Sequence, residues 1–282
     1  MDSTRRLPPA LVEHARAFLR GDRLPVTPKG AATVVLLRQG AGGYDDRLEV
    51  YLLRRHSRMA FAAGMYAFPG GTVDPRDSDR AVAWAGPSPA EWADRLDCDE
   101  LGARALVCAA VRETFEESGV LLTGATADSI VEDTTGDEWE RDRAALVERS
   151  LSFADLLGTR GLVLRTDLLA TWAHWITPEF EPRRYDTRFF VAALPRGQRT
   201  RDVSGEADTV AWMTAADALA GVDSGVMGML PPTYITLREI ATFATVEAVW
   251  AAAARRRIVT VVPGVEIDGE EGLLTLPPGV VT

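Results

Sequence analysis

Short apolar runs alternate along the chain with polar, turn-forming stretches, and this pattern predicts a mixture of strands and helices. The apolar runs over 31–38 and 48–53, separated by a glycine-rich link, predict two neighbouring strands. Other strand patterns are found at 186–194, at 209–213 and in the alternating tail, where Asp268 and Gly269 predict a hairpin turn. Helical patterns cover 101–118, parts of 123–170, 214–220 and 231–257. The alternation predicts an α/β fold.

Interruptions in this pattern indicate how the chain is organised. Residues 66–71, YAFPGG, predict an extended segment that ends in a tight turn. The polar, proline-containing stretch that follows, about 74–100, predicts an insertion with one short helix beginning near Ser88. We expect three parts: an N-terminal helix and lead-in over 1–29, one domain over 30–276, and a tail over 277–282. The domain carries helical insertions at about 74–100 and 123–170.

Composition narrows the class of protein. The chain has 31 basic and 41 acidic residues and a formal charge of -10, which argues against a nucleic-acid partner because phosphate binding needs a basic face. Its two cysteines, Cys98 and Cys108, are expected to be free thiols of a cytoplasmic protein. No apolar run is long enough to predict a membrane span or a leader peptide. A single lysine and no asparagine among 282 residues indicate GC-rich coding and a bacterial source.

The most informative segment is the predicted helix that ends at Gly119. Helical geometry places Glu113, Glu116 and Glu117 on one face, while the opposite face is apolar and is expected to pack on a sheet. A solvated acidic face is the simple interpretation. However, like charges near the C-terminal end of a helix repel one another and oppose its macrodipole. A bound Mg²⁺ or Mn²⁺ would remove both penalties, and such sites commonly take a phosphate-containing substrate.

Two motifs in this region resemble the signature of the Nudix hydrolases, Gx5Ex7REUxEExGU, where U is apolar. They are FPGG at 68–71 and RETFEESG at 112–119. Asp77 stands where the signature has its first glutamate, and Thr114 replaces an apolar residue. A long insertion separates the two halves, which resembles the branch that contains peroxisomal coenzyme A diphosphatases. Four further strings are similar to that branch: TPEF at 177–180, RYDTRFF at 184–190, GEADTVAW at 205–212 and LPPT at 230–233.

The resemblance implies a Nudix fold, an α/β/α sandwich with a mixed sheet, and a set of site residues. It implies four metal ligands: Glu113, Glu116, Glu117 and the carbonyl group of Gly71. Either Glu116 or Glu117 would act as general base. Arg112 would orient the acids, and Asp77 would take the place of the acid that pairs with it.

Residues 52–71 carry the clues to substrate. LLRRHSRMAFAAGMYAFPGG is similar to the stretch that precedes FPGG in coenzyme A diphosphatases, with departures at His56 and Ala60. Arg54, Arg55 and Arg58 are candidates for binding substrate phosphates, since guanidinium groups match phosphate oxygens. Solvated arginines at a strand end are the alternative. Downstream, Glu206 is a further candidate for the substrate site.

Together these features predict a metal-dependent pyrophosphohydrolase that cleaves the diphosphate of coenzyme A, acyl-CoA or a related nucleoside diphosphate derivative. The alternatives are an ADP-ribose or NADH pyrophosphatase, a non-catalytic Nudix-like ligand sensor and a scaffolding protein. We expect a small-molecule nucleoside diphosphate as partner, no nucleic acid and no membrane, and the resemblance implies a homodimer.

Overall fold

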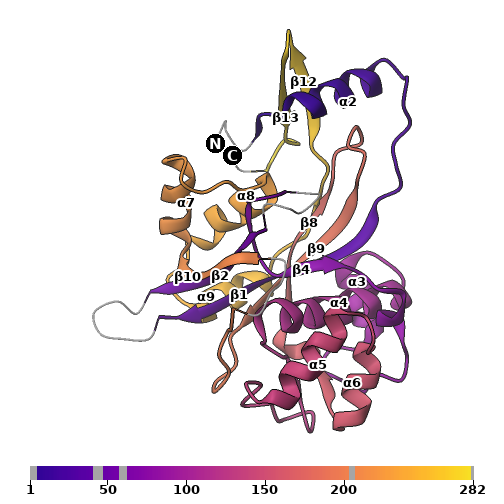
Figure 1. The fold of residues 1–282 in the computed structure, drawn as a ribbon, viewed down its shortest axis with the longest axis vertical. Helices are drawn as coiled ribbons and strands as arrows, with labels where there is room; N and C mark the ends of the chain where they lie inside the picture. Colours follow the sequence, from indigo (N-terminus) through magenta and orange to yellow (C-terminus); the bar gives the residue numbers. More distant parts are fainter. Residues whose placement is uncertain (1–4, 41–46, 57–61, 203–206, 281–282) are drawn as a thin grey trace.

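The computed structural model describes residues 5–40, 47–56, 62–202 and 207–280. A mixed sheet with the strand order β10-β2-β1-β9-β8-β11 runs through its middle (Figure 1). The strands of this path are β1 (Lys29–Gln39), β2 (Leu48–Arg55), β8 (Ala170–Ile176), β9 (Tyr185–Ala193), β10 (Ala207–Thr214) and β11 (Thr260–Val261). The two central strands, β1 and β9, pair in parallel. The pairs β10–β2, β2–β1 and β9–β8 are antiparallel. The predicted strand pair β1–β2 is confirmed.

Helices cover both faces of this sheet. Because successive side chains of a strand point to opposite faces, Val34 and Leu36 of β1 enter one core, and Val35 and Leu37 enter the other. The first core is closed by α3 (Pro89–Leu96), α4 (Glu100–Ser118), α5 (Asp137–Val147) and α6 (Phe153–Arg160). The second is closed by α7 (Ala215–Asp223), α8 (Pro231–Ile240) and α9 (Val246–Ala253). The predicted α/β/α sandwich with a mixed sheet is therefore confirmed.

The two predicted insertions lie together on the first face. The earlier one forms a 3₁₀ turn, η1 (Pro75–Ser78), a short strand, β5 (Trp84–Ala85), and helix α3. Helix α3 begins at Ser88, whose hydroxyl accepts a hydrogen bond from the Glu91 N–H in a capping box, as predicted. The later insertion contributes α5, α6, β6 (Thr123–Gly124), β7 (Val163–Arg165) and η2 (Thr166–Leu168). Strands β5, β7 and β6 form a small second sheet that links the two insertions.

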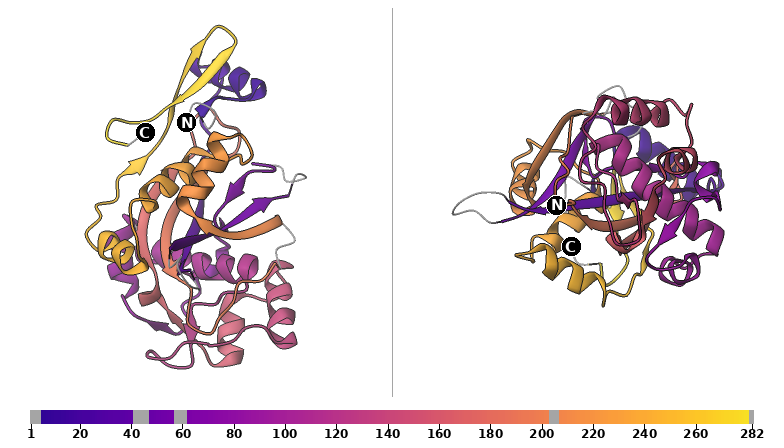
Figure 2. Two further views of the ribbon diagram at one scale, coloured as in Figure 1. Left: turned by 90° about the vertical axis from the view of Figure 1, so that its left-hand side faces the viewer. Right: turned by 90° about the horizontal axis from the view of Figure 1, so that it is seen from below.

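Segments near the two ends of the chain pack side by side (Figures 1 and 2). Helix α2 (Pro9–Leu19) lies against the hairpin of β12 (Gly264–Asp268) and β13 (Glu271–Thr275), whose turn includes the predicted Gly269. Val12, Ala15 and Leu274 form part of the apolar contact. No helix in the described part of the chain is both long enough and apolar enough to cross a bilayer.

Two predictions about elements were wrong, and one strand was missed. The segment 231–257 is not one helix, since α8 ends at Ile240 and α9 begins after Thr245, whose hydroxyl accepts from the Ala248 N–H and thus competes with helix continuation. Strand β8 replaces an unassigned apolar segment, TWAHWI, which lacks alternation because it is buried within the sandwich. The segment 66–71 includes extended backbone as predicted, but its two glycines begin a short strand, β4 (Gly70–Thr72), instead of forming a tight turn.

Candidate active site

Helix α4 carries the acidic segment, and its ends are set by the local sequence. The Asp99 side chain caps the N-terminus by accepting a hydrogen bond from the Gly102 N–H at 2.6 Å. At the other end Gly119 adopts φ +75°, the left-handed conformation that glycine favours after a helix. Val111 and Phe115 on the apolar face are fully buried against the sheet. The predicted boundaries of this helix and its packing are confirmed.

Two glycines bring a strand close to this helix. Strand β3 (Tyr66–Ala67) pairs with β2, while β4 (Gly70–Thr72) pairs with β1. A Cβ atom on Gly70 would lie 2.7 Å from Thr33 Cα, and one on Gly71 would lie 2.5 Å from the Glu113 carboxyl carbon. Any side chain would separate β4 from β1 or from α4. The glycines of FPGG therefore serve close approach, not a turn.

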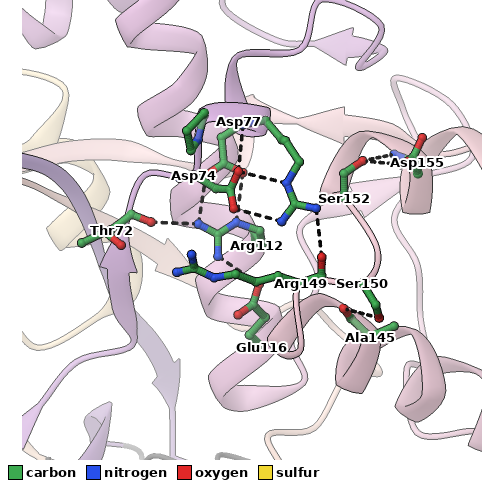
Figure 3. Close-up of polar contacts among 12 residues, drawn as sticks. Thr72, Asp74, Asp77, Arg112, Glu116, Ala145, Arg149, Ser150, Ser152 and Asp155 are labelled. Carbon is green, nitrogen blue, oxygen red and sulfur yellow. Dashed lines mark hydrogen bonds and ion pairs between the residues drawn. The ribbon is translucent and has the colours of Figure 1, made fainter.

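Arg112 is the centre of a buried ion-pair network (Figure 3). Its Nε and Nη2 atoms donate to the two carboxylate oxygens of Asp77, both at 2.9 Å. Its Nη1 atom donates to Glu113 Oε1 at 2.8 Å and to Glu116 Oε1 at 2.9 Å. A further bond from Nη2 reaches the carbonyl oxygen of Thr72 on β4 at 3.0 Å. One guanidinium thus holds three carboxylates and one strand in fixed positions.

The third carboxylate of the acidic face points to the glycine strand. Glu117 is buried, and its Oε2 atom accepts a hydrogen bond from the Gly70 N–H at 2.8 Å. Glu113 lies against Gly71, as the distance above shows. Each of the three glutamates predicted to share a helix face therefore contacts β4 or Arg112.

Burial makes the ionised form of these acids costly. It raises the pKa of Glu113 to about 7, and repulsion from Glu116 adds to this effect while Arg112 opposes it. Burial likewise raises the pKa values of Glu116 and Asp77. Three carboxylates compete for one guanidinium, so the site carries an excess of buried negative charge.

This donor set fits a hard divalent cation. In the described ranges, no three His, Cys, Asp or Glu side chains form a ready-made group of metal ligands. Glu113 and Glu116, however, each use only the Oε1 atom to bind Arg112, which leaves an Oε2 atom on each as a donor. Carboxylate oxygens are the preferred ligands of Mg²⁺ and Mn²⁺, and a cation would offset the excess negative charge.

A cavity of about 340 Å³ opens over these acids. Its floor includes Gly70, Gly71, Glu113 and Glu116. The turn between α5 and α6 forms one wall with Leu146, Val147, Arg149, Leu151 and Phe153, and the sheet contributes Thr33, Tyr185 and Thr187. The insertion over 123–170, whose role the sequence left open, therefore closes the site. A cavity lined by acids and arginines suits a charged, metal-bound ligand.

Of the arginines predicted to bind phosphate, one lines the cavity and another does not. Arg55 lines the cavity. Arg54 does not, because it lies on the opposite side of β2 from Arg55 and binds Asp208 of β10 with 2.6 Å between Nε and Oδ1. The expectation that Arg54 faces the substrate is thus not supported by its position. Arg58 and Glu206 lie outside the described residues.

Other candidates have structural positions. Trp172 and Trp175, two aromatic residues close to TPEF in the sequence, belong to the core of the second face. Both cysteines are free thiols, and burial raises the pKa of the Cys108 thiol to about 12, so this thiol is unreactive.

Sequence reasoning missed Arg76 and Arg149, which also line the cavity. Neither carries a sequence signal, since both belong to insertions whose path is set by tertiary packing.

The comparisons with known proteins all point to one family. The family model described as the NUDT19 Nudix domain matches residues 90–240, more than half of the chain. Acyl-coenzyme A diphosphatase NUDT19 of Xenopus laevis is 27% identical over 237 residues, which cover 70% of this chain and 61% of that protein. The protein of the same name from Gallus gallus is 26% identical, over 76% of this chain and 68% of that protein. The chain therefore spans less than two thirds of the length of the Xenopus relative.

A solved structure is similar over most of the chain. The crystal structure of a NUDIX hydrolase from Alicyclobacillus acidocaldarius has a TM-score of 0.69 and 30% sequence identity, and the match covers 80% of this chain and 96% of that one. The family model and the solved structure name the same family, Nudix. This chain belongs to the Nudix hydrolase family, in the branch described by the NUDT19 Nudix domain.

Proposed function

We propose that this protein is a metal-dependent Nudix pyrophosphohydrolase that cleaves the diphosphate of coenzyme A, acyl-CoA or a related nucleoside diphosphate derivative. The observation that carries the proposal is the acidic face of α4 held against Gly70 and Gly71 at the floor of the cavity. The substrate class is supported by the names of the Xenopus and Gallus relatives, both acyl-coenzyme A diphosphatases.

The proposed metal ligands are Glu113, Glu116, Glu117 and the Gly71 carbonyl group. A bound Mg²⁺ or Mn²⁺ would offset negative charge on the diphosphate and lower the pKa of a water molecule. Arg112 positions Glu113 and Glu116 through its Nη1 atom, and Asp77 anchors the other side of the guanidinium. This division of roles explains why a buried arginine is needed in an acidic site.

Glu116 is the better of the two candidates for general base. Its side chain lines the cavity, where a substrate and an attacking water would be placed. Glu117 is instead engaged by the backbone N–H of Gly70. We therefore assign proton removal to Glu116 in addition to its ligand role, and a ligand role alone to Glu117. We assign binding of substrate phosphate to Arg55.

The test is product analysis of the purified chain with coenzyme A, ADP-ribose and NADH, each with and without Mg²⁺ or Mn²⁺. We expect metal-dependent release of 3′,5′-ADP from coenzyme A. Glu116→Gln should lower kcat by roughly 100-fold or more. Glu100→Gln, the same exchange at the exposed start of α4, is the matched control and should leave activity unchanged.

Each outcome of this test has a definite meaning. A clear preference for ADP-ribose or NADH would keep the enzyme class and replace coenzyme A as substrate. Binding of these compounds without turnover would identify a ligand sensor and contradict the proposed hydrolase.

Two further expectations belong to the same proposal. The family resemblance supports a homodimer, for which light scattering of the purified protein is the direct measurement. A cytoplasmic location is supported by the two free cysteines, and fractionation of the source cells would test it.

A further inference from the structure

The turn between α5 and α6 holds an arginine in an unusual backbone conformation. Arg149 has φ +60°, one of three non-glycine residues in the described chain with positive φ. Its N–H donates to the Leu146 carbonyl oxygen at 2.8 Å, and the Ser150 N–H donates to that of Ala145 at 2.9 Å. These two bonds form a Schellman motif, in which the residue at the position of Arg149 is usually glycine.

Two other helices of this chain follow the usual preference, whereas α3 ends at Asp97 in the same conformation. Helices α4 and α6 also end in the left-handed region, and there the residue is Gly119 or Gly161. A residue with a Cβ atom is strained in this conformation, and such strain is concentrated at functional sites. The backbone of the α5–α6 turn thus favours glycine, and arginine stands there at a cost in backbone strain.

Packing fixes the position of the strained turn. The Arg149 carbonyl oxygen accepts a hydrogen bond from Arg76 Nη1 at 3.1 Å. Arg76 is held in turn by Asp74, with Nε and Nη2 each 3.0 Å from a carboxylate oxygen. Asp74 caps η1, the turn that carries Asp77. Arg149 is therefore tied to the same wall that anchors Arg112.

The Arg149 side chain extends from this turn into the space beside Arg112 and Glu116 (Figure 3), and it lines the cavity. Two other arginines of the wall are engaged by carboxylates: Arg112 by Asp77, Glu113 and Glu116, and Arg76 by Asp74. Arg149 itself has an exposed side chain, and its charge lowers the pKa of Glu116, against the larger effect of burial. Its guanidinium is thus a cation beside the acids that would hold a metal.

We propose that Arg149 binds a phosphate oxygen of the substrate diphosphate at the wall of the cavity that the α5–α6 turn forms. This inference rests on the proposed function and adds a substrate-binding residue to it. A guanidinium group matches the geometry of phosphate oxygens and keeps its charge at any physiological pH. The diphosphate would then lie between a cation held by α4 and Arg149 of the insertion.

The decisive variant is Arg149→Gly, because its expected effects on stability and activity have opposite signs. Relief of backbone strain should raise the unfolding midpoint by roughly 1–4 °C. Loss of the guanidinium should lower kcat/KM for the diphosphate substrate by about 10-fold or more. It should also weaken, by a similar factor, the binding of methylenediphosphonate, a diphosphate analogue that cannot be hydrolysed, measured by calorimetry with Mg²⁺.

Asp97→Gly is the matched control. Asp97 ends α3 with φ +51°, so the exchange relieves the same kind of strain away from the cavity and should leave kcat/KM unchanged. Arg149→Gln serves as a second variant, which removes the charge and keeps a side chain of similar length. It should lose activity and analogue binding like Arg149→Gly, whether or not the glycine variant folds.

The proposal is overturned if both Arg149 variants bind the analogue and turn over substrate within about twofold of Asp97→Gly. If the wild-type protein hydrolyses no diphosphate but binds the analogue in an Arg149-dependent way, the proposed function fails and the anion-binding role of Arg149 stands. If the wild-type protein does not bind the analogue either, both are wrong.

Discussion

At the scale of single residues, the site depends on how buried charges are balanced. Arg112 is bonded to Asp77, Glu113 and Glu116, and burial raises the pKa values of all three acids. The ion pairs offset part of the desolvation cost, and the rest is an unfavourable charge that a cation can relieve. Local stability is thus lower than in a site with balanced charges, and the proposed cation would restore part of it.

Arg112→Met tests this balance. Removal of the guanidinium leaves three buried carboxylates without their partner, so the free energy of unfolding should fall by about 3–5 kcal/mol near neutral pH. The loss should shrink at acid pH, because carboxyl groups whose folded-state pKa is raised destabilise the fold only as pH rises and they ionise. Urea unfolding across a pH series measures both effects. Arg141→Met, an exposed exchange on α5, should change stability by less than about 0.5 kcal/mol.

Glu181, in the loop after β8, makes a second test of buried charge. Burial raises its pKa from 4.5 to about 7. The folded state therefore binds the proton more tightly than the unfolded state, and stability falls as pH rises from 4.5 through 7. Glu181→Gln should raise the free energy of unfolding by about 1–3 kcal/mol at about pH 8, and this gain should vanish toward about pH 4. An equal gain from Glu179→Gln, its exposed neighbour, would contradict the assignment to burial.

At the scale of elements, the site is the junction of helix α4 with strand β4. The cap residues Asp99 and Gly119 fix the length of α4, and the two glycines of β4 let the strand approach both β1 and the helix. The caps are local in sequence, which is why the helix was predicted within one residue of its N-terminal boundary. Strand β8 lacked such signals and was missed. The approach of β4 is a tertiary contact, and its glycines were predicted to form a turn.

The close approach of β4 to β1 predicts a difference between two Gly→Ala exchanges. In Gly70→Ala the new Cβ would meet the Ala32 carbonyl oxygen and lie 2.7 Å from Thr33 Cα, both backbone atoms that cannot give way without moving β1. The free energy of unfolding should fall by about 1–3 kcal/mol, and activity should fall with it. Gly30→Ala in β1 is the control, since its Cβ would meet only Val73 Cγ2, at 3.5 Å. Equal stability of the two variants, measured by denaturant unfolding, would refute the close-packing argument.

At the scale of the whole molecule, segments remote in sequence assemble the cavity. The acids come from α4, the glycines from β4, one wall from the α5–α6 turn and another from β9. A ligand that binds only this assembled site stabilises the folded state by mass action. The unfolding temperature therefore reports on metal binding without any assumption about substrate.

Addition of Mg²⁺ should raise the unfolding midpoint, because the folded protein holds the acids together and the unfolded chain does not. At a concentration about 100 times the dissociation constant the gain should be about 2.7 kcal/mol. The triple variant Glu113→Gln/Glu116→Gln/Glu117→Gln should lose the Mg²⁺-dependent shift. An equal shift from NaCl at matched ionic strength would show a salt effect instead of a metal site.

The sequence by itself determined the features that local rules control. Spacing placed Glu113, Glu116 and Glu117 on one helix face, the cap residues fixed the helix ends, and the motifs pointed to the Nudix fold and to the contact between Arg112 and Asp77. These features follow from the helical period, from capping and from motif spacing. Each of these can be recognised in the sequence without knowledge of the tertiary structure.

Only the tertiary structure decided which other residues face the cavity. Arg54 and Arg55 are adjacent in sequence, yet only Arg55 lines the cavity, because successive side chains of a strand point to opposite faces of a sheet. Arg149 follows a helix whose position depends on packing against α4 and η1, and no local pattern encodes such long-range contacts. The path of the chain and the burial of its side chains are set by packing throughout the core. The same packing places the wall of the cavity.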